Sequence, residues 1–234
     1  MDGLRLHKRL ELVKNLILED YPNATFLHIG PRGCGKSLFL KHILYERLKQ
    51  GFRCVNLCVK SRPIDFLWLM RKRNMDAETY LKSGDLILID YHTAKLGHPT
   101  MEALDNVLQL TTLDLTELSV MLDMLRLKPV EFFYVDSLLD IFIDFGYKNA
   151  MKFIDTLITR IKDTCVGAFA LDKGILGDRI ENYLRSIVDG VAEYMIVDTP
   201  EGIERYIRMA HFDFANVDTR WHKLVIGQYD IKIE

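Results

Sequence analysis

The sequence predicts an α/β domain with a mostly parallel central sheet, flanking helices and antiparallel strands at its C-terminal end. Short apolar runs alternate with helical patterns over most of the chain, which is typical of parallel strands joined by crossover helices. A glycine-rich segment connects the first of these runs to a helix. After residue 190, strand-like segments follow one another without helices between them, so we expect the sheet to end in antiparallel hairpins.

The glycine-rich segment Gly30–Ser37 reads GPRGCGKS and has the complete spacing G-x-x-x-x-G-K-[ST]. Glycines allow the backbone to curl until its N–H groups face phosphate oxygens, and the helix that follows adds the positive end of its dipole. Lys36 is expected to reach the β and γ phosphates, and the Ser37 hydroxyl to bind Mg²⁺. The predicted nucleotide-binding residues are Gly30, Pro31, Arg32, Gly33, Cys34, Gly35, Lys36, Ser37 and Leu38.

The remaining elements follow from hydrophobic periodicity and from turn residues. Leu6, Leu10, Val13 and Ile17 recur at helical spacing, so an amphipathic helix is expected at 4–19. The N-terminal segment 1–24, which contains this helix, is expected to pack on a single domain, residues 25–234. Further helices are expected at 38–50, 63–73, 76–82, 147–164 and 178–186, with one or two more within 100–127. Strands are expected at 25–29, 52–59, 85–90, 131–135, 166–171, 191–197, 204–212, 221–227 and 229–233.

Composition excludes several broad classes. The formal charge of −2 and pI near 6.4 give no global attraction to nucleic acid or to an anionic membrane, so DNA binding would need a local basic patch. Four cysteines lack the spacing of a zinc site and are expected to be buried, reduced thiols. With no apolar run of spanning length and no signal peptide at the N-terminus, a cytoplasmic protein is expected.

The second half of a nucleotide site is predicted at Asp136, which follows the apolar run 132–135. A carboxylate at the end of a neighbouring buried strand is what the Mg²⁺ of bound ATP or ADP needs, so Ser37 and Asp136 are the predicted metal ligands. The alternative for Asp136 is a cap on the next helix, and Asp90 is a weaker candidate for the same role. No catalytic residue is assigned, and Asp136 is retained only as a second choice. Asp172 is a candidate sensor of the γ-phosphate or else a turn residue.

These segments together resemble a KaiC-like member of the RecA superfamily, the group that includes the RadA paralogues and the KaiC-like protein of the archaellum motor. The resemblance runs from about Thr25 to Glu234, and only its phosphate-loop motif is highly specific. It implies a RecA-like P-loop NTPase fold that binds ATP with Mg²⁺. The matching segments are Gly30–Ser37, Leu38–Leu40, Cys54–Val59, Ser61–Asp65, Tyr80–Asp90, Tyr134–Ser137 and Ile187–Val191.

Two departures from the family pattern bear on function. Members that hydrolyse ATP carry one or two glutamates after the second strand, where this chain has Lys60 and Ser61. Hexameric members carry Lys-x-Arg in a C-terminal strand, where this chain has 208–210, Arg-Met-Ala. The resemblance therefore implies a Mg-ATP-binding protein with weak or absent hydrolysis, acting as a nucleotide-dependent regulatory or assembly subunit with a protein partner or with further copies of itself.

Two alternatives stay open. The first is a working ATPase in which another residue, or a partner chain, positions the attacking water. The second is a recombination or repair accessory similar to the RadA paralogues, which would bind single-stranded DNA. The cluster Arg71-Lys72-Arg73, with Arg62, is a candidate for contact with a nucleic-acid backbone, although a solvated helix end is the favoured interpretation.

Overall fold

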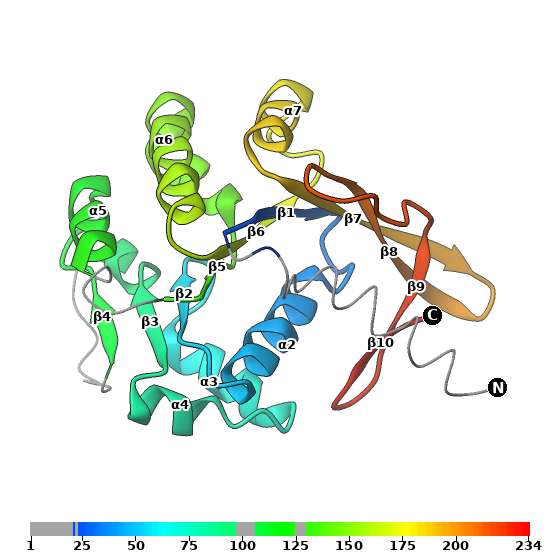
Figure 1. The fold of residues 1–234 in the computed structure, drawn as a ribbon, viewed down its shortest axis with the longest axis horizontal. Helices are drawn as coiled ribbons and strands as arrows, with labels where there is room; N and C mark the ends of the chain where they lie inside the picture. The colour runs from blue at the N-terminus through cyan, green and yellow to red at the C-terminus, as the bar shows by residue number, and fades with distance from the viewer. Residues whose placement is uncertain (1–20, 22, 97–105, 125–129) are drawn as a thin grey trace.

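The structure is a computed structural model that describes residues 21, 23–96, 106–124 and 130–234. A ten-stranded sheet forms its centre, in the order β10-β9-β8-β7-β1-β6-β5-β2-β3-β4 (Figure 1). The strands from β4 to β7 in this order pair in parallel, and the pairs from β7 to β10 are antiparallel. The strands are β1 Thr25–Gly30, β2 Cys54–Cys58, β3 Leu86–Asp90, β4 Val107–Gln109, β5 Phe132–Val135, β6 Val166–Asp172, β7 Gly190–Thr199, β8 Gly202–Phe212, β9 His222–Ile226 and β10 Ile231–Ile233.

Helices cover both faces of this sheet, as the alternation of elements predicts (Figure 1). One apolar core lies between the sheet and α2, α3 and α4, and the other between the sheet and α5, α6 and α7. The mostly parallel sheet with C-terminal antiparallel strands confirms the predicted fold class. The helices are α2 Lys36–Lys49, α3 Pro63–Lys72, α4 Ala77–Ser83, α5 Leu115–Met124, α6 Leu138–Lys162 and α7 Asp178–Ile187, with a 3₁₀ turn, η1, at Thr93–Leu96.

The helix predicted at 147–164 begins nine residues earlier, at Leu138. Ser137 starts it, because its hydroxyl accepts a hydrogen bond from the amide of Asp140 at 3.4 Å. Gly146 interrupts it with a left-handed φ of 70°. The helical pattern of apolar residues that the sequence shows belongs to the part of α6 after Gly146. The kink at Gly146 separates this part from the first turns of the helix.

The expectation of helices alone within 100–127 is wrong in part. Residues 107–109 form β4, which pairs in parallel with β3 at the edge of the sheet, and α5 begins only at Leu115. Three residues are too few to display an alternating pattern, so the strand depends on its neighbour. The predicted helix at 4–19 lies outside the described residues, and the division at residue 24 therefore stays a prediction.

The structure also bears on the expectations about membrane spans and about the cysteines. Within those residues, we find no helix with both the length and the apolar character needed to cross a bilayer. Cys34, Cys54, Cys58 and Cys165 are buried free thiols, as expected. Burial raises the pKa of the Cys165 thiol to about 12, so this side chain is protonated and unreactive at neutral pH.

Candidate functional site

The glycine-rich segment forms a loop that leaves the carboxyl end of β1 and turns into α2. Gly33 and Gly35 have φ values of 85° and 92°, a left-handed conformation that other residues adopt only with strain. A Cβ atom on Gly35 would also lie 2.4 Å from Cδ1 of Ile226, which projects from β9. The loop therefore needs glycine at position 35 for its backbone angle and for the close approach of a distant strand.

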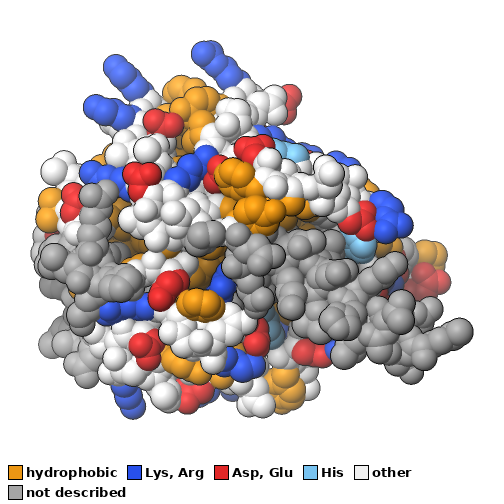
Figure 2. Space-filling view, viewed as in Figure 1, with side chains coloured by type: hydrophobic (Ala, Val, Ile, Leu, Met, Phe, Trp, Pro, Cys, Tyr) orange, Lys and Arg blue, Asp and Glu red, His pale blue; other side chains and the backbone are white. Residues whose placement is uncertain are grey.

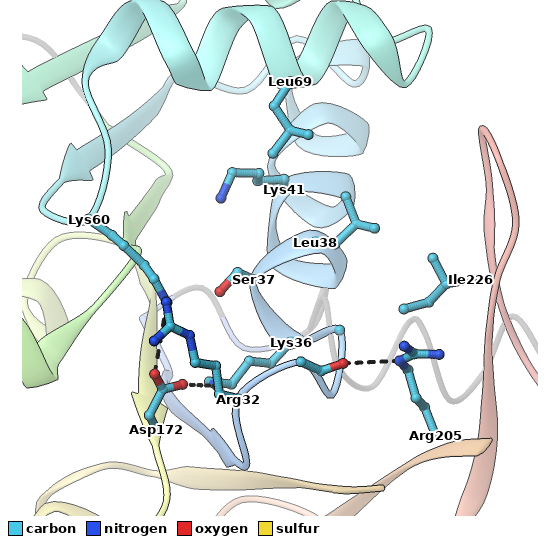
Figure 3. A pocket seen from close by; sticks show the side chains of 12 residues that line it. Arg32, Lys36, Ser37, Leu38, Lys41, Lys60, Leu69, Asp172, Arg205 and Ile226 are labelled. Atoms are coloured by element: carbon cyan, nitrogen blue, oxygen red, sulfur yellow. Dashed lines mark hydrogen bonds and ion pairs between the residues drawn. The ribbon is translucent and has the colours of Figure 1, made fainter. Parts of the chain in front are cut away.

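A cavity of about 530 Å³ opens beside this loop (Figure 3), within the usual size range of small-molecule sites. Cationic side chains surround it, and among the described lining residues the one carboxylate is that of Asp172. Such an excess of positive charge at a helix N-terminus favours a polyanion such as the phosphate chain of a nucleotide. The cations are Arg32, Lys36, Lys41, Lys60 and Arg205.

Each predicted loop residue can now be placed. The cavity is lined by Arg32, Gly33, Gly35, Lys36, Ser37 and Leu38. Gly30, Pro31 and Cys34 do not line the cavity. The carbonyl oxygens of Gly30 and Pro31 accept hydrogen bonds from Nζ of Lys36 at 3.3 and 3.4 Å, and Cys34 is fully buried. The loop thus presents all but three of its residues to the cavity, and the carbonyl groups of its first two residues hold Lys36.

Lys36 and Asp172 form a buried ion pair between the loop and the end of β6 (Figure 3). Lys60, at the end of β2, brings its ammonium to 3.8 Å from the other Asp172 oxygen. Asp172 therefore lies between Lys36 and Lys60, two of the three lysines that line the cavity. A phosphate group entering here would compete with this carboxylate for both cations.

Asp136 directly follows β5, as the sequence predicts, and it is 4% exposed. Its Oδ1 accepts hydrogen bonds from the backbone amides of Val59 and Lys60, at 2.9 and 3.0 Å. The alternative role as a helix cap is wrong, because Ser137 caps α6. Asp90 does act as a local cap, accepting from the amide of Thr93 at 3.0 Å. Burial raises the pKa of Asp136, and the nearby ammonium of Lys41 and the two amides oppose that shift.

The residues fit a nucleotide-bound Mg²⁺. Magnesium in such sites takes one or two protein ligands and completes its shell with phosphate oxygens and water. The described residues contain no cluster of three or more acidic, histidine or cysteine ligands, so a metal here would depend on the nucleotide. Figure 3 shows the Ser37 hydroxyl directed into the cavity. Ser37 would bind the ion directly, whereas Asp136, which is not among the residues that line the cavity, would act on it through water. The ion would neutralise phosphate charge when bound.

Sequence reasoning missed two cations of the cavity, Lys41 and Arg205. Lys41 follows the apolar stretch 38–40 of α2 and resembles a solvated helix residue, yet it is only 5% exposed. Arg205 comes from β8, and its Nε donates to the Gly33 carbonyl oxygen at 3.0 Å. No local pattern in the sequence could place Arg205 at the loop, because the two contacting residues are 172 positions apart.

Arg208, in the stretch that departs from the family's Lys-x-Arg, does not line this cavity. Its Nε donates to Glu193 at 2.8 Å, and its guanidinium lies over the ring of Trp221, 4.6 Å from the ring centroid. Arg208 thus stabilises the antiparallel strands β7–β9 within the chain.

A phosphate loop between β1 and α2, with a carboxylate at the end of a nearby parallel strand, defines a P-loop nucleotide-binding domain. A family model described as "ATPase: KaiC" matches residues 15–234. The chain therefore belongs to the KaiC family of ATPases, within the RecA superfamily. A solved structure titled KaiC-like protein PH0186, from the hyperthermophilic archaeon Pyrococcus horikoshii OT3, has the same fold, with a TM-score of 0.69 and 16% identity. The match covers 91% of this chain and 90% of that one. No curated protein matches the sequence.

Proposed function

We propose that this chain binds ATP in the cavity beside Gly30–Ser37 and retains it with little hydrolysis, acting as a nucleotide-dependent regulatory or assembly subunit. Binding is supported by the loop conformation, the helix N-terminus and the five cations that line the cavity. ATP and ADP share the phosphates that this lining would contact. Mg²⁺ would be held at Ser37 and Asp136.

The position of Lys60 carries the argument for retention. A carboxylate at the end of β2 would orient and deprotonate the attacking water, and general-base catalysis of this kind contributes ~10²–10⁴-fold to a rate. Lys60 occupies that place and has its ammonium 3.8 Å from Asp172, where it can pair with a phosphate oxygen. An ammonium cannot accept the proton of water at neutral pH, so this residue favours binding over turnover.

A second candidate, a working ATPase, is favoured by Asp172. This is the one carboxylate among the described lining residues, and phosphate binding to Lys36 and Lys60 would release it from both. A freed carboxylate near the γ-phosphate is in a position to orient water. Asp172→Asn separates the two proposals, because it removes turnover only if Asp172 performs this role.

A DNA-binding role has less support. On the face seen in Figure 2, acidic and basic side chains are interspersed among the described residues. Three cations of the candidate basic cluster already have partners: Arg71 pairs with Glu78, Arg62 with Asp65, and Lys72 lies over Trp68. These contacts agree with a folded helix surface, the interpretation favoured from the sequence.

The test follows radiolabelled ATP on the purified protein, alone and with single-stranded DNA. We expect ATP to stay bound and intact over many minutes, with turnover far below the typical ~1 per second. Multiple turnovers near that rate, abolished by Lys36→Ala, would establish the ATPase alternative. A Lys60→Glu variant, which places a carboxylate at the end of β2, should hydrolyse ATP faster than the unmodified chain.

A further inference from the structure

Lys41 is a buried cation whose ammonium has no hydrogen-bond acceptor among the described residues. Two aromatic rings flank it, with the ammonium 5.5 Å from the centroid of Tyr134 and 5.7 Å from that of Phe66. Cation–π contact offsets only part of the cost of removing an ammonium from water. A buried lysine in this condition is a preformed binding point for an anion.

The direction of the side chain places that anion in the nucleotide cavity. Lys41 lies one helical turn after Ser37 on α2, and helical side chains lean toward the N-terminus of their helix. Figure 3 shows the Lys41 ammonium and the Ser37 hydroxyl turned toward the same side of the cavity, the side on which Lys60 lies. Lys41 thus points at the space where Mg²⁺ and the phosphate oxygens would meet.

Asp136 connects Lys41 to the predicted metal site. Asp136 comes two residues after Tyr134, whose ring lies beside the Lys41 ammonium, and two backbone amides fix its carboxylate. Burial lowers the pKa of Lys41, and the charge of Asp136 opposes this shift. The chain therefore already holds a positive charge beside the carboxylate that would face the metal. In a usual site of this kind, the divalent ion supplies that charge.

We propose that Lys41 binds an oxygen of the nucleotide's terminal phosphates and supplies, from within the chain, charge that Mg²⁺ would otherwise bring, so that ATP binds without a divalent cation. This inference depends on the proposed nucleotide site and adds a specific contact and a metal requirement to it. Mg²⁺ can still bind at Ser37, but it contributes little to affinity.

The experiment measures the affinity of ATP by calorimetry, once with MgCl₂ and once with EDTA. We expect the unmodified chain to lose no more than tenfold on removal of the metal. Lys41→Met, which keeps the length and apolar stem of the side chain, should bind ATP with Mg²⁺ but lose at least a hundredfold in EDTA. Lys41→Arg should restore much of the metal-free binding, because it restores the cation.

Lys49→Met is the matched control on the same helix, since Lys49 is exposed and pairs with Glu46. It should leave both affinities unchanged. A loss of more than tenfold for the unmodified chain in EDTA, or metal-free binding that survives Lys41→Met, would overturn the role of Lys41 while leaving the nucleotide site intact. Absence of ATP binding under both conditions would overturn the nucleotide site itself, and this inference with it.

Discussion

Nζ of Lys36 is paired with Oδ1 of Asp172, although the two residues lie 136 positions apart and both are buried. The lysine that is expected to hold the β and γ phosphates thus has an anionic partner inside the chain. Binding of nucleotide must exchange this carboxylate for phosphate oxygens. The affinity of the site depends on the difference between the two interactions.

Asp172→Asn should therefore bind ATP and ADP more tightly, by about tenfold, which corresponds to about 1.4 kcal/mol. The substitution removes a competitor for Lys36 and a negative charge near the phosphates, and an amide oxygen can still accept from the lysine. Calorimetric titration measures the change. Asp198→Asn, an exposed position on β7, is the control for loss of one negative charge. Weaker binding in Asp172→Asn would instead identify this residue as part of the nucleotide contact.

Lys36→Ala should abolish the increase in melting temperature that ATP causes. In the unmodified chain, ATP at a hundred times its dissociation constant should stabilise the fold by about 2.7 kcal/mol. The variant loses the main phosphate contact and leaves the buried Asp172 with only the more distant ammonium of Lys60, so the ligand-free protein should also melt earlier. Thermal melts with and without ATP measure both effects, with Lys49→Ala as control. An undiminished ATP-induced increase would place the nucleotide elsewhere.

Gly35→Ala should destabilise the fold by about 1–3 kcal/mol, because alanine is strained at φ 92° and its Cβ would meet Ile226. Gly51→Ala is a matched control, since Gly51 has a similar φ of 87° but open space around the added atom. Denaturant unfolding measures both. Adding Ile226→Val, which removes Cδ1, should recover part of the loss in Gly35→Ala. Equal effects at the two glycines would show that the contact with β9 is unimportant.

His28 should make the fold sensitive to acid. Burial lowers its pKa to about 3, and its Nδ1 lies 2.8 Å from the Tyr194 hydroxyl. The unfolded chain binds a proton near pH 6.5 while the folded chain does not, so this group's stabilising contribution is complete above pH 6.5. It is lost as the pH falls toward 3, by about 1.4 kcal/mol per pH unit.

His28→Gln tests this pH dependence, because the amide can still bond Tyr194 but does not titrate. Free energies of unfolding measured from pH 7 to pH 4 should decrease less steeply in the variant than in the unmodified chain. Parallel curves would contradict the assignment of this acid sensitivity to His28.

The phosphate loop could be predicted because its chemistry is local: eight consecutive residues contain the glycines, the lysine and the serine. The position of Asp136 at the end of a buried strand could be predicted from the apolar run before it, although Asp90 and Asp172 end similar strands. The same reasoning located most helices and strands to within a few residues. Periodicity is informative wherever an element is long enough to repeat.

The rest depends on contacts that periodicity does not encode. β4 has three residues and is defined by its pairing with β3. Arg205 and Ile226 reach the phosphate loop from strands that follow it by more than 160 residues. Lys41 has an ordinary helical position, and only the packing of Tyr134 and Phe66 around it makes it a buried cation.

The contact of Ile226 with the loop at Gly35 has a consequence for synthesis of the protein. The loop is translated early, but the side chain that packs against it follows roughly 190 residues later. At ~5–20 residues per second, a ribosome needs about 10 to 40 s to cover that distance. During this interval, the nascent chain contains the phosphate-binding motif without the strand that packs against it. A ribosome-bound intermediate stalled before residue 226 should therefore capture nucleotide poorly, and the released chain should capture it well.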